Sequence, residues 1–237
     1  MAERIQDYRG ERLVVRFDGG RCIHSRNCVL GHPQVFVPNA DGPWIRPDNA
    51  ASEEVAAIVR SCPSGALTYE RQDGANEAAP PVNTVRVWEN GPLAVHADLA
   101  IEGQARRLRA TLCRCGASRA KPFCDGSHRT AAFAATGEPA TQDSAALAVR
   151  DGPLSVRPLV NGPLMLKGAL EIVSGTGRTV TRATEAFLCR CGHSENKPFC
   201  DGTHKRIGFT AEGGSRKTLS SAPQSSDDAG QQPGRQS

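Results

Sequence analysis

Two stretches of the chain beyond residue 90 are apolar at every second position. The alternating positions are Leu93, Val95, Ala97, Leu99 and Ile101 in the first stretch, and Leu164, Leu166, Gly168, Leu170 and Ile172 in the second. A period of two is typical of strands that bury one face. An Asn-Gly-Pro turn signal precedes each stretch. Further strands are predicted over 107–112 and 185–188, and each of them runs into a Cys-x-Cys sequence.

The N-terminal region has a different pattern. Residues 12–17 (RLVVRF) form a strand candidate, and an amphipathic helix is predicted from Ser52 through Val59. Glu53 and Glu54 suit the first turn of that helix, and Cys62-Pro63 ends it. A further strand is expected after the Cys-Pro. The predicted fold class is therefore α+β, with a small mixed unit followed by two β-rich modules.

Polar, proline-ended segments divide the chain. Residues 72–81 (QDGANEAAPP) read as a linker, and 135–144 form a weaker spacer. From 215 to 237 no apolar periodicity remains, so this tail is predicted to be disordered. The predicted boundaries are 1–71 for the N-terminal unit, 72–81 for the linker, 82–136 and 137–214 for the two modules, and 215–237 for the tail.

The two modules contain an internal repeat. Residues 112–128 read LCRCGASRAKPFCDGSH and residues 188–204 read LCRCGHSENKPFCDGTH, with 13 of 17 positions identical at an offset of 76. Phe133 and Phe209 extend the match at the same offset. The modules are therefore duplicates of one another.

The composition favours metal binding. Aromatic residues make up 5% of the 237 residues, and there are 24 glycines and 16 prolines, so the cores are small and need a metal or disulfides. The nine cysteines are an odd number, residues 1–10 lack an apolar leader, and no apolar run is long enough to span a bilayer. We therefore expect a soluble cytoplasmic protein without membrane partners, whose cysteines are reduced and bind metal.

Charge and motifs exclude several function classes. The net charge is +4, with 9 basic and 11 acidic residues in 1–81 against 20 and 14 in 82–237. No basic stripe alternates with aromatics, so no nucleic-acid partner is expected. Phosphate-binding loops, paired catalytic carboxylates and a nucleophile elbow are also missing, so the chain is predicted not to be an enzyme.

The repeat supplies two sets of candidate metal ligands. They are Cys113, Cys115, Cys124 and His128 in the first copy, and Cys189, Cys191, Cys200 and His204 in the second. A Cys-x-Cys on a strand points both sulfurs to one face, and residues four apart share one face of a helical turn. We expect Asp125 and Asp201 to cap that turn, and Ser118 and Ser194 to donate hydrogen bonds toward cluster sulfur. Three cysteines and a histidine also suit tetrahedral zinc, so zinc stays an alternative on these residues alone.

Both copies resemble the CDGSH iron–sulfur (mitoNEET-like) family, whose pattern is Cys-x-Cys, Ser or Thr, then Pro-x-Cys-Asp-Gly-x-His. The resemblance implies two [2Fe-2S] clusters, each held by the three cysteines and one histidine of its copy. Tandem members are similar to a homodimer within one chain, which implies a monomer with an intrachain pseudo-dimer. The membrane anchor of some members has no counterpart in this sequence.

Three cysteines remain in the N-terminal unit: Cys22, Cys28 and Cys62, the last followed by Pro63. Residues 11–71 resemble small single-cluster ferredoxins whose middle cysteine is replaced, here by Ser25. The resemblance implies a ferredoxin-like domain with a [3Fe-4S] cluster, or a [4Fe-4S] cluster with a non-cysteine fourth ligand. His24 is either that ligand or an exposed loop residue. The alternative is a degenerate fold that has lost its iron.

The sequence thus predicts a soluble multi-cluster electron carrier. Histidine in place of cysteine removes a negative charge and raises the potential of a cluster. It also eases release of the cluster, so the competing function is cluster transfer or iron and redox sensing. A third possibility is an electron-delivery subunit of an enzyme, with the acidic N-terminal domain docking to a basic partner.

Overall fold

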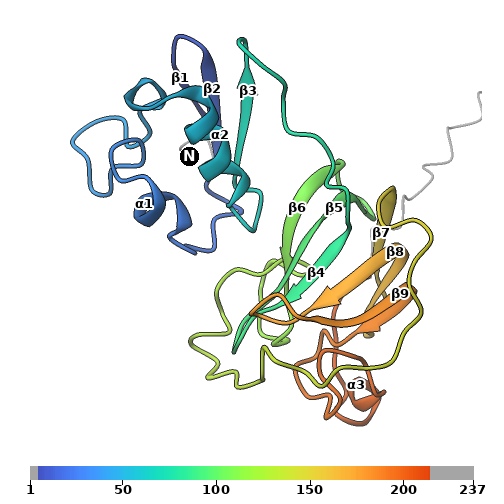
Figure 1. The fold of residues 1–237 in the computed structure, drawn as a ribbon. Coiled ribbons are helices and arrows are strands. Elements are labelled where there is room, and N and C mark those ends of the chain that lie inside the picture. Colours follow the sequence, from blue (N-terminus) through green and yellow to red (C-terminus); the bar gives the residue numbers. More distant parts are fainter. Residues whose placement is uncertain (1–4, 214–237) are drawn as a thin grey trace, which may run out of the picture.

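The computed structural model describes residues 5–213, and the predicted disordered tail lies outside them. The N-terminal unit is an antiparallel sheet of order β1-β2-β3 with helices on one side (Figure 1). Its elements are β1 (Ile5–Arg9), β2 (Leu13–Asp18), α1 (Asn27–Gly31), the 3-10 helix η1 (Pro47–Asn49), α2 (Ser52–Arg60) and β3 (Leu67–Arg71). The predicted strand and helix are confirmed as β2 and α2, with Glu53 and Glu54 in the first turn of α2.

Residues 84–188 form one six-stranded sheet. Its strands are β4 (Thr84–Val87), β5 (Leu93–Ile101), β6 (Arg107–Leu112), β7 (Pro153–Pro158), β8 (Leu164–Val173) and β9 (Thr179–Leu188), and the short helix α3 (Thr203–Arg206) follows. The alternating stretches are confirmed as β5 and β8. The strand predicted over 185–188 is longer than expected, because β9 follows β8 back along most of its length.

The two modules exchange strand pairings. The first strand of each module, β4 or β7, pairs antiparallel with the next strand of its own module, β5 or β8. The first strand of each module also pairs parallel with the second strand of the other module: β4 pairs with β8, and β7 pairs with β5. These four pairings close a cycle, so the modules share one sheet.

Two hydrophobic cores lie on either side of the linker. One is built by β2, β3 and α2 and centres on residues such as Val15, Phe36 and Val55; the other fills the inside of the six-stranded sheet. The chain is thus mostly β with few and short helices, as expected for a ferredoxin-like unit followed by CDGSH-like modules. The domain boundaries stay a prediction. Over residues 5–213, the helices are all too short or too polar to cross a bilayer.

Candidate metal centres

The Cys-x-Cys sequences directly follow β6 and β9. The sulfurs of Cys113 and Cys115 lie 3.7 Å apart, and those of Cys189 and Cys191 lie 3.8 Å apart. The expected extended strand through each Cys-x-Cys is wrong, because the strands end at Leu112 and Leu188 and the bent backbone that follows brings the two sulfurs together. Two thiolates bound to one tetrahedral metal at about 2.3 Å lie about 3.75 Å apart. Each Cys-x-Cys therefore has the spacing of two ligands on one metal ion.

A loop folds the remaining two ligands of each copy into a second pair. The Sγ atom of Cys124 lies 3.4 Å from Nδ1 of His128, and the same atoms of Cys200 and His204 lie 3.3 Å apart. The Cys124 N–H donates to the Thr111 carbonyl (2.9 Å), which holds this pair beside the strand that carries Cys113. Each copy thus presents its four ligands as two close pairs.

The predicted helical turn from cysteine to histidine is wrong. Gly126 and Gly202, which lie between the two ligands, have left-handed backbones with φ of 88° and 85°. A right-handed turn cannot pass through such a residue. The glycine therefore interrupts the turn between the two candidate ligands, and in the second copy the helix α3, which holds His204, begins only after it.

The aspartates and serines of the motif stabilise this loop. Asp125 accepts hydrogen bonds from the N–H groups of Arg119 (2.8 Å) and Ser127 (3.0 Å), so it ties two parts of the loop together rather than capping a helix. The Ser118 hydroxyl donates to the Phe123 carbonyl (2.7 Å), so the expected bond to cluster sulfur is wrong. The same contacts recur at Asp201 and Ser194.

Burial and mutual contact set the protonation of the ligands. The hydrogen bond with Cys113 lowers the pKa of the Cys115 thiol to about 6, which favours its thiolate at neutral pH. Burial raises the pKa of Cys124 to about 11. Burial, followed by the charge of Arg129, lowers the pKa of His128, so its imidazole is neutral at pH 7. A thiolate and a neutral imidazole are the forms that bind metal.

A buried arginine between the two cysteines of each copy was missed by the sequence analysis. Arg114 and Arg190 are each only 1% exposed. The Arg114 guanidinium donates to the carbonyls of Gly91 (2.9 Å) and Thr136 (3.0 Å) and lies over the Phe133 ring. Arg190 repeats this arrangement on its own module. The signal was present in the sequence, because the arginine and the phenylalanine are both identical in the two copies.

The three N-terminal cysteines line one cavity of about 280 Å³. Cys22 lies in the loop after β2, Cys28 in α1, and Cys62 just after α2. Protein interiors are close-packed, and one water accounts for only about 30 Å³ of liquid volume. A space of this size lined by three thiols therefore fits a bound multinuclear cluster. Burial raises the pKa of Cys22 and Cys28.

The candidate fourth ligand His24, although it is an exposed loop residue, lines the same cavity as Ser25. Ser25 occupies the place of the missing middle cysteine, and His24 has Nδ1 3.9 Å from the Cys22 sulfur. His24 and Arg26 have left-handed backbones, with φ of 53° and 66°, so the loop curls around the cavity. The structure thus keeps both residues within reach of the site.

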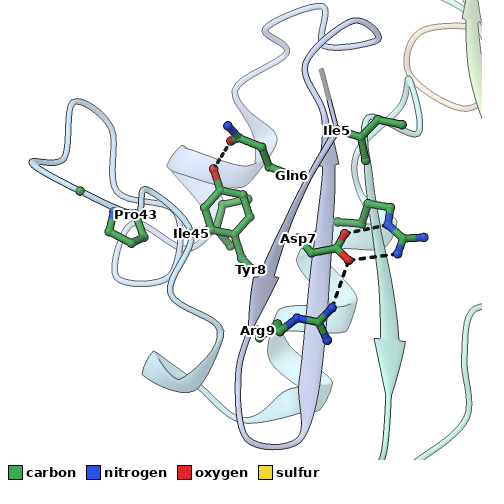
Figure 2. A pocket seen from close by; sticks show the side chains of 9 residues that line it. Ile5, Gln6, Asp7, Tyr8, Arg9, Pro43 and Ile45 are labelled. Atoms are coloured by element: carbon green, nitrogen blue, oxygen red, sulfur yellow. Dashed lines mark hydrogen bonds and ion pairs between the residues drawn. The ribbon is translucent and has the colours of Figure 1, made fainter. Parts of the chain in front are cut away.

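Another surface hollow has none of the predicted ligands in its lining. It lies beside β1, where Asp7 pairs with Arg16 (2.7 Å) and the Tyr8 hydroxyl donates to Gln6 (2.7 Å) (Figure 2). Over residues 5–213, no three His, Cys, Asp or Glu side chains converge as ligands of a single metal ion. The paired arrangement described above is what the structure has instead.

Comparison with known proteins identifies both parts of the chain. Residues 8–72 match a family described as a divergent 4Fe-4S mono-cluster, and residues 90–129 and 161–205 match the iron-binding zinc finger of CDGSH type. The N-terminal part is similar to the uncharacterized protein YjdI of Escherichia coli K12, and equally to that of strain O157:H7. Each is 40% identical over 65 residues, which is 27% of this chain and 84% of the relative.

These matches agree with the geometry of the thiol-lined cavity and of the two paired ligand sets. The families that match both bind iron, and the descriptions assign a 4Fe-4S site to the first. The chain is an iron–sulfur protein: a divergent 4Fe-4S mono-cluster domain, through which it is a relative of YjdI, precedes two tandem modules of the iron-binding CDGSH type.

Proposed function

We propose that the chain is a multi-cluster electron carrier with two [2Fe-2S] clusters and one [3Fe-4S] or [4Fe-4S] cluster. A bound iron–sulfur cluster takes up and releases single electrons. The chain's own residues hold it, exclude water from it and tune its potential through ligand type and hydrogen bonding.

The pairing of ligands is the observation that carries the proposal. In the first module, Cys113 and Cys115 would bind one iron, and Cys124 and His128 the other; the second module would use Cys189, Cys191, Cys200 and His204 in the same way. The pair distances of 3.7 and 3.4 Å suit two tetrahedral irons. A mononuclear zinc site needs its donors around one point, and over residues 5–213 no three His, Cys, Asp or Glu side chains converge in that way.

In the N-terminal domain, Cys22, Cys28 and Cys62 would hold the third cluster, with Ser25 or His24 as further donors. The cavity of about 280 Å³ supports this assignment over a degenerate fold that has lost its iron. A domain without a cluster has no reason to keep a thiol-lined void of this size.

We further propose that the chain is a monomer whose modules form an intrachain pseudo-dimer. The exchanged parallel pairings, β4 with β8 and β5 with β7, support it. The reciprocal contacts of Gly116 with the Cys191 carbonyl and of Gly192 with the Cys115 carbonyl also support it.

The direct test is the content of iron, acid-labile sulfide and zinc per chain, with visible and EPR spectra before and after one-electron reduction. We expect about four irons from the modules, further iron from the N-terminal site, and reversible reduction through repeated cycles. The protein with all three N-terminal cysteines changed to serine is the matched control, and it should keep only the [2Fe-2S] signals. Colourless protein with stoichiometric zinc would contradict the proposal.

A second candidate function is cluster transfer. The candidate ligand histidines are half-buried, as are Cys115 and Cys200, whereas Cys113 and Cys189 are buried, so each histidine is within reach of protons from solvent. Movement of iron and sulfide to an apo-ferredoxin on mild acidification, together with cluster loss during redox cycling, would favour this function over the carrier.

A further inference from the structure

The N-terminal domain is attached to only one of the two CDGSH modules. It lies beside β6 of the first module and away from β8, β9 and α3 of the second (Figure 1). Over residues 5–213, every hydrogen bond and ion pair between residues 5–71 and the modules goes to the first module. The two repeated sites therefore have different surroundings.

Arg109 makes the main attachment. It extends from β6, is 4% exposed, and donates hydrogen bonds to the carbonyls of Cys62 (2.9 Å), Leu67 (3.1 Å) and Val59. Its charge is paired with Glu77 of the linker at 2.6 Å. Val59 is in the last turn of α2, where its carbonyl also accepts from the Cys62 N–H (3.0 Å), and the C-terminal end of a helix favours a cation. Arg109 thus fixes the backbone that carries the Cys62 thiol.

Arg129 makes a second attachment on the other side of the N-terminal site. It directly follows His128, and its guanidinium donates to the carbonyl of Ile23 (3.3 Å), the residue after Cys22. One module therefore touches the backbone next to two of the three N-terminal cysteines.

The space between the two sites is a cavity of about 360 Å³ that both domains line. Ser64 lines it from the N-terminal domain, and Cys124 lines it from the first module. The Ser64 hydroxyl lies 3.7 Å from the Cys62 sulfur. A ligand of each site is therefore adjacent to the same interdomain cavity.

The second module has no equivalent of these attachments. At the offset of 76, Arg109 corresponds to Glu185, which pairs with Lys167 at the surface, and Arg129 corresponds to Lys205. Thr111 is 2% exposed under the N-terminal domain, whereas its counterpart Phe187 is 41% exposed. The repeat has diverged at the positions that the N-terminal domain contacts.

We propose that Arg109 and Arg129 are positioning residues that hold the N-terminal site against the first CDGSH site, making these two the internal electron-exchange pair. The second site is then the one that faces external partners. This inference rests on the proposed carrier function. One electron, supplied by an external one-electron reductant, leaves one site of the pair, which is oxidised, and reduces the other. Electron transfer slows steeply with distance, so a fixed separation sets its rate.

The test uses two variants of the full chain, Arg109→Gln and Arg129→Ala. Their matched controls carry the changes Glu185→Gln and Lys205→Ala at the equivalent positions of the second module. Pulsed dipolar EPR on the half-reduced protein measures the separation of the N-terminal centre from each [2Fe-2S] centre. Stopped-flow spectroscopy after reduction by limiting dithionite measures redistribution of electrons between the centres.

In the wild type and both second-module variants, the N-terminal centre should lie at one short, narrowly distributed distance from the first [2Fe-2S] centre. The rate at which electrons redistribute between the centres should not depend on protein concentration. In Arg109→Gln and Arg129→Ala that separation should broaden, and redistribution should slow by about tenfold or more, with all clusters still bound. If Arg109→Gln does not fold, the inference is tested by the behaviour of Arg129→Ala and by the distances between the centres in the wild type. A broad wild-type distribution, equal separations to both modules, or unchanged redistribution in Arg129→Ala would overturn the inference. Absence of iron and sulfide from the wild type would instead overturn the proposed function.

Discussion

Gly116 of the first module packs directly against the backbone carbonyl of Cys191 in the second, so a Cβ atom at position 116 would overlap it. Gly116 also has a left-handed backbone, with φ of 81°. Gly116→Ala should therefore lower the free energy of unfolding by about 2–5 kcal/mol, from backbone strain and overpacking together. Because the overlap moves a ligand of the second site, both [2Fe-2S] absorption signals should weaken.

Gly152→Ala is the matched control. Its φ is 83°, but no atom lies within 4 Å of the Cβ it would add. It should cost about 1–2 kcal/mol from strain alone and leave the spectra unchanged. Equal effects of the two substitutions in urea unfolding would show that the modules do not pack as described.

Replacing Arg114 by lysine should destabilise the first module despite keeping the charge. Lysine lacks the planar fork that reaches several carbonyls, and each buried acceptor left unpaired costs about 1–3 kcal/mol. We expect a loss of about 2–4 kcal/mol in unfolding free energy, measured by urea titration. Arg119→Lys, at an exposed position of the same loop, is the control and should change stability little. If Arg114→Lys leaves the free energy of unfolding unchanged, the arginine does not have the structural role assigned to it.

The His128 site should lose iron as the pH falls. Burial lowers the pKa of His128, so the imidazole is neutral at pH 7, and protonation competes with metal only below its ordinary value of about 6.5. In His128→Cys, bleaching of the first cluster should move to lower pH, and its reduction potential should fall because a negative charge is added. His193→Gln, at an exposed histidine beside the second site, should bleach as the wild type does. An acid profile unaffected by His128→Cys would show that His128 is not a ligand.

Ser25→Cys should place a fourth thiol on the N-terminal cavity. Ser25 lines that cavity with Cys22, Cys28 and Cys62, at the position where four-cysteine sites have their middle ligand. We expect a [4Fe-4S] spectrum in Mössbauer and EPR measurements, and slower loss of iron in air than in the wild type. Ser61→Cys is the control, since Ser61 is exposed and outside the cavity. If both variants give the wild-type spectrum, Ser25 does not face the cluster.

Much of the local structure could be predicted from periodicity. The strand β5 and the helix α2 were found because their burial follows a regular repeat in the sequence. The strand β7 was missed although Leu154 and Val156 alternate with exposed residues, because it is short and begins and ends with proline. The candidate ligands were found because cysteine and histidine carry their chemistry in the side chain.

The contacts between domains were beyond sequence reasoning. Arg109 binds backbone carbonyls, which every residue has, so nothing in the sequence of its partners identifies them. The pairing of β4 with β8 joins Thr84 to Glu171, and no local pattern encodes a register over such a separation. The helical spacing of Cys124 and His128 was also misleading, because Gly126 between them has a φ of 88°, which a right-handed helical turn does not allow.

The exchanged pairing of β4 with β8 also constrains how the protein is made. When a ribosome has released the first CDGSH module, β4 and β5 still lack the parallel partners that the second module supplies. Long-range pairings of this kind form late in folding, and unpaired strand edges are prone to aggregation. The first ligand set is therefore left on an incomplete sheet until residues beyond 171 emerge. We therefore expect the nascent cysteines of the first module to need protection from oxidation during that interval, and iron and sulfide to be inserted after the second module has been translated.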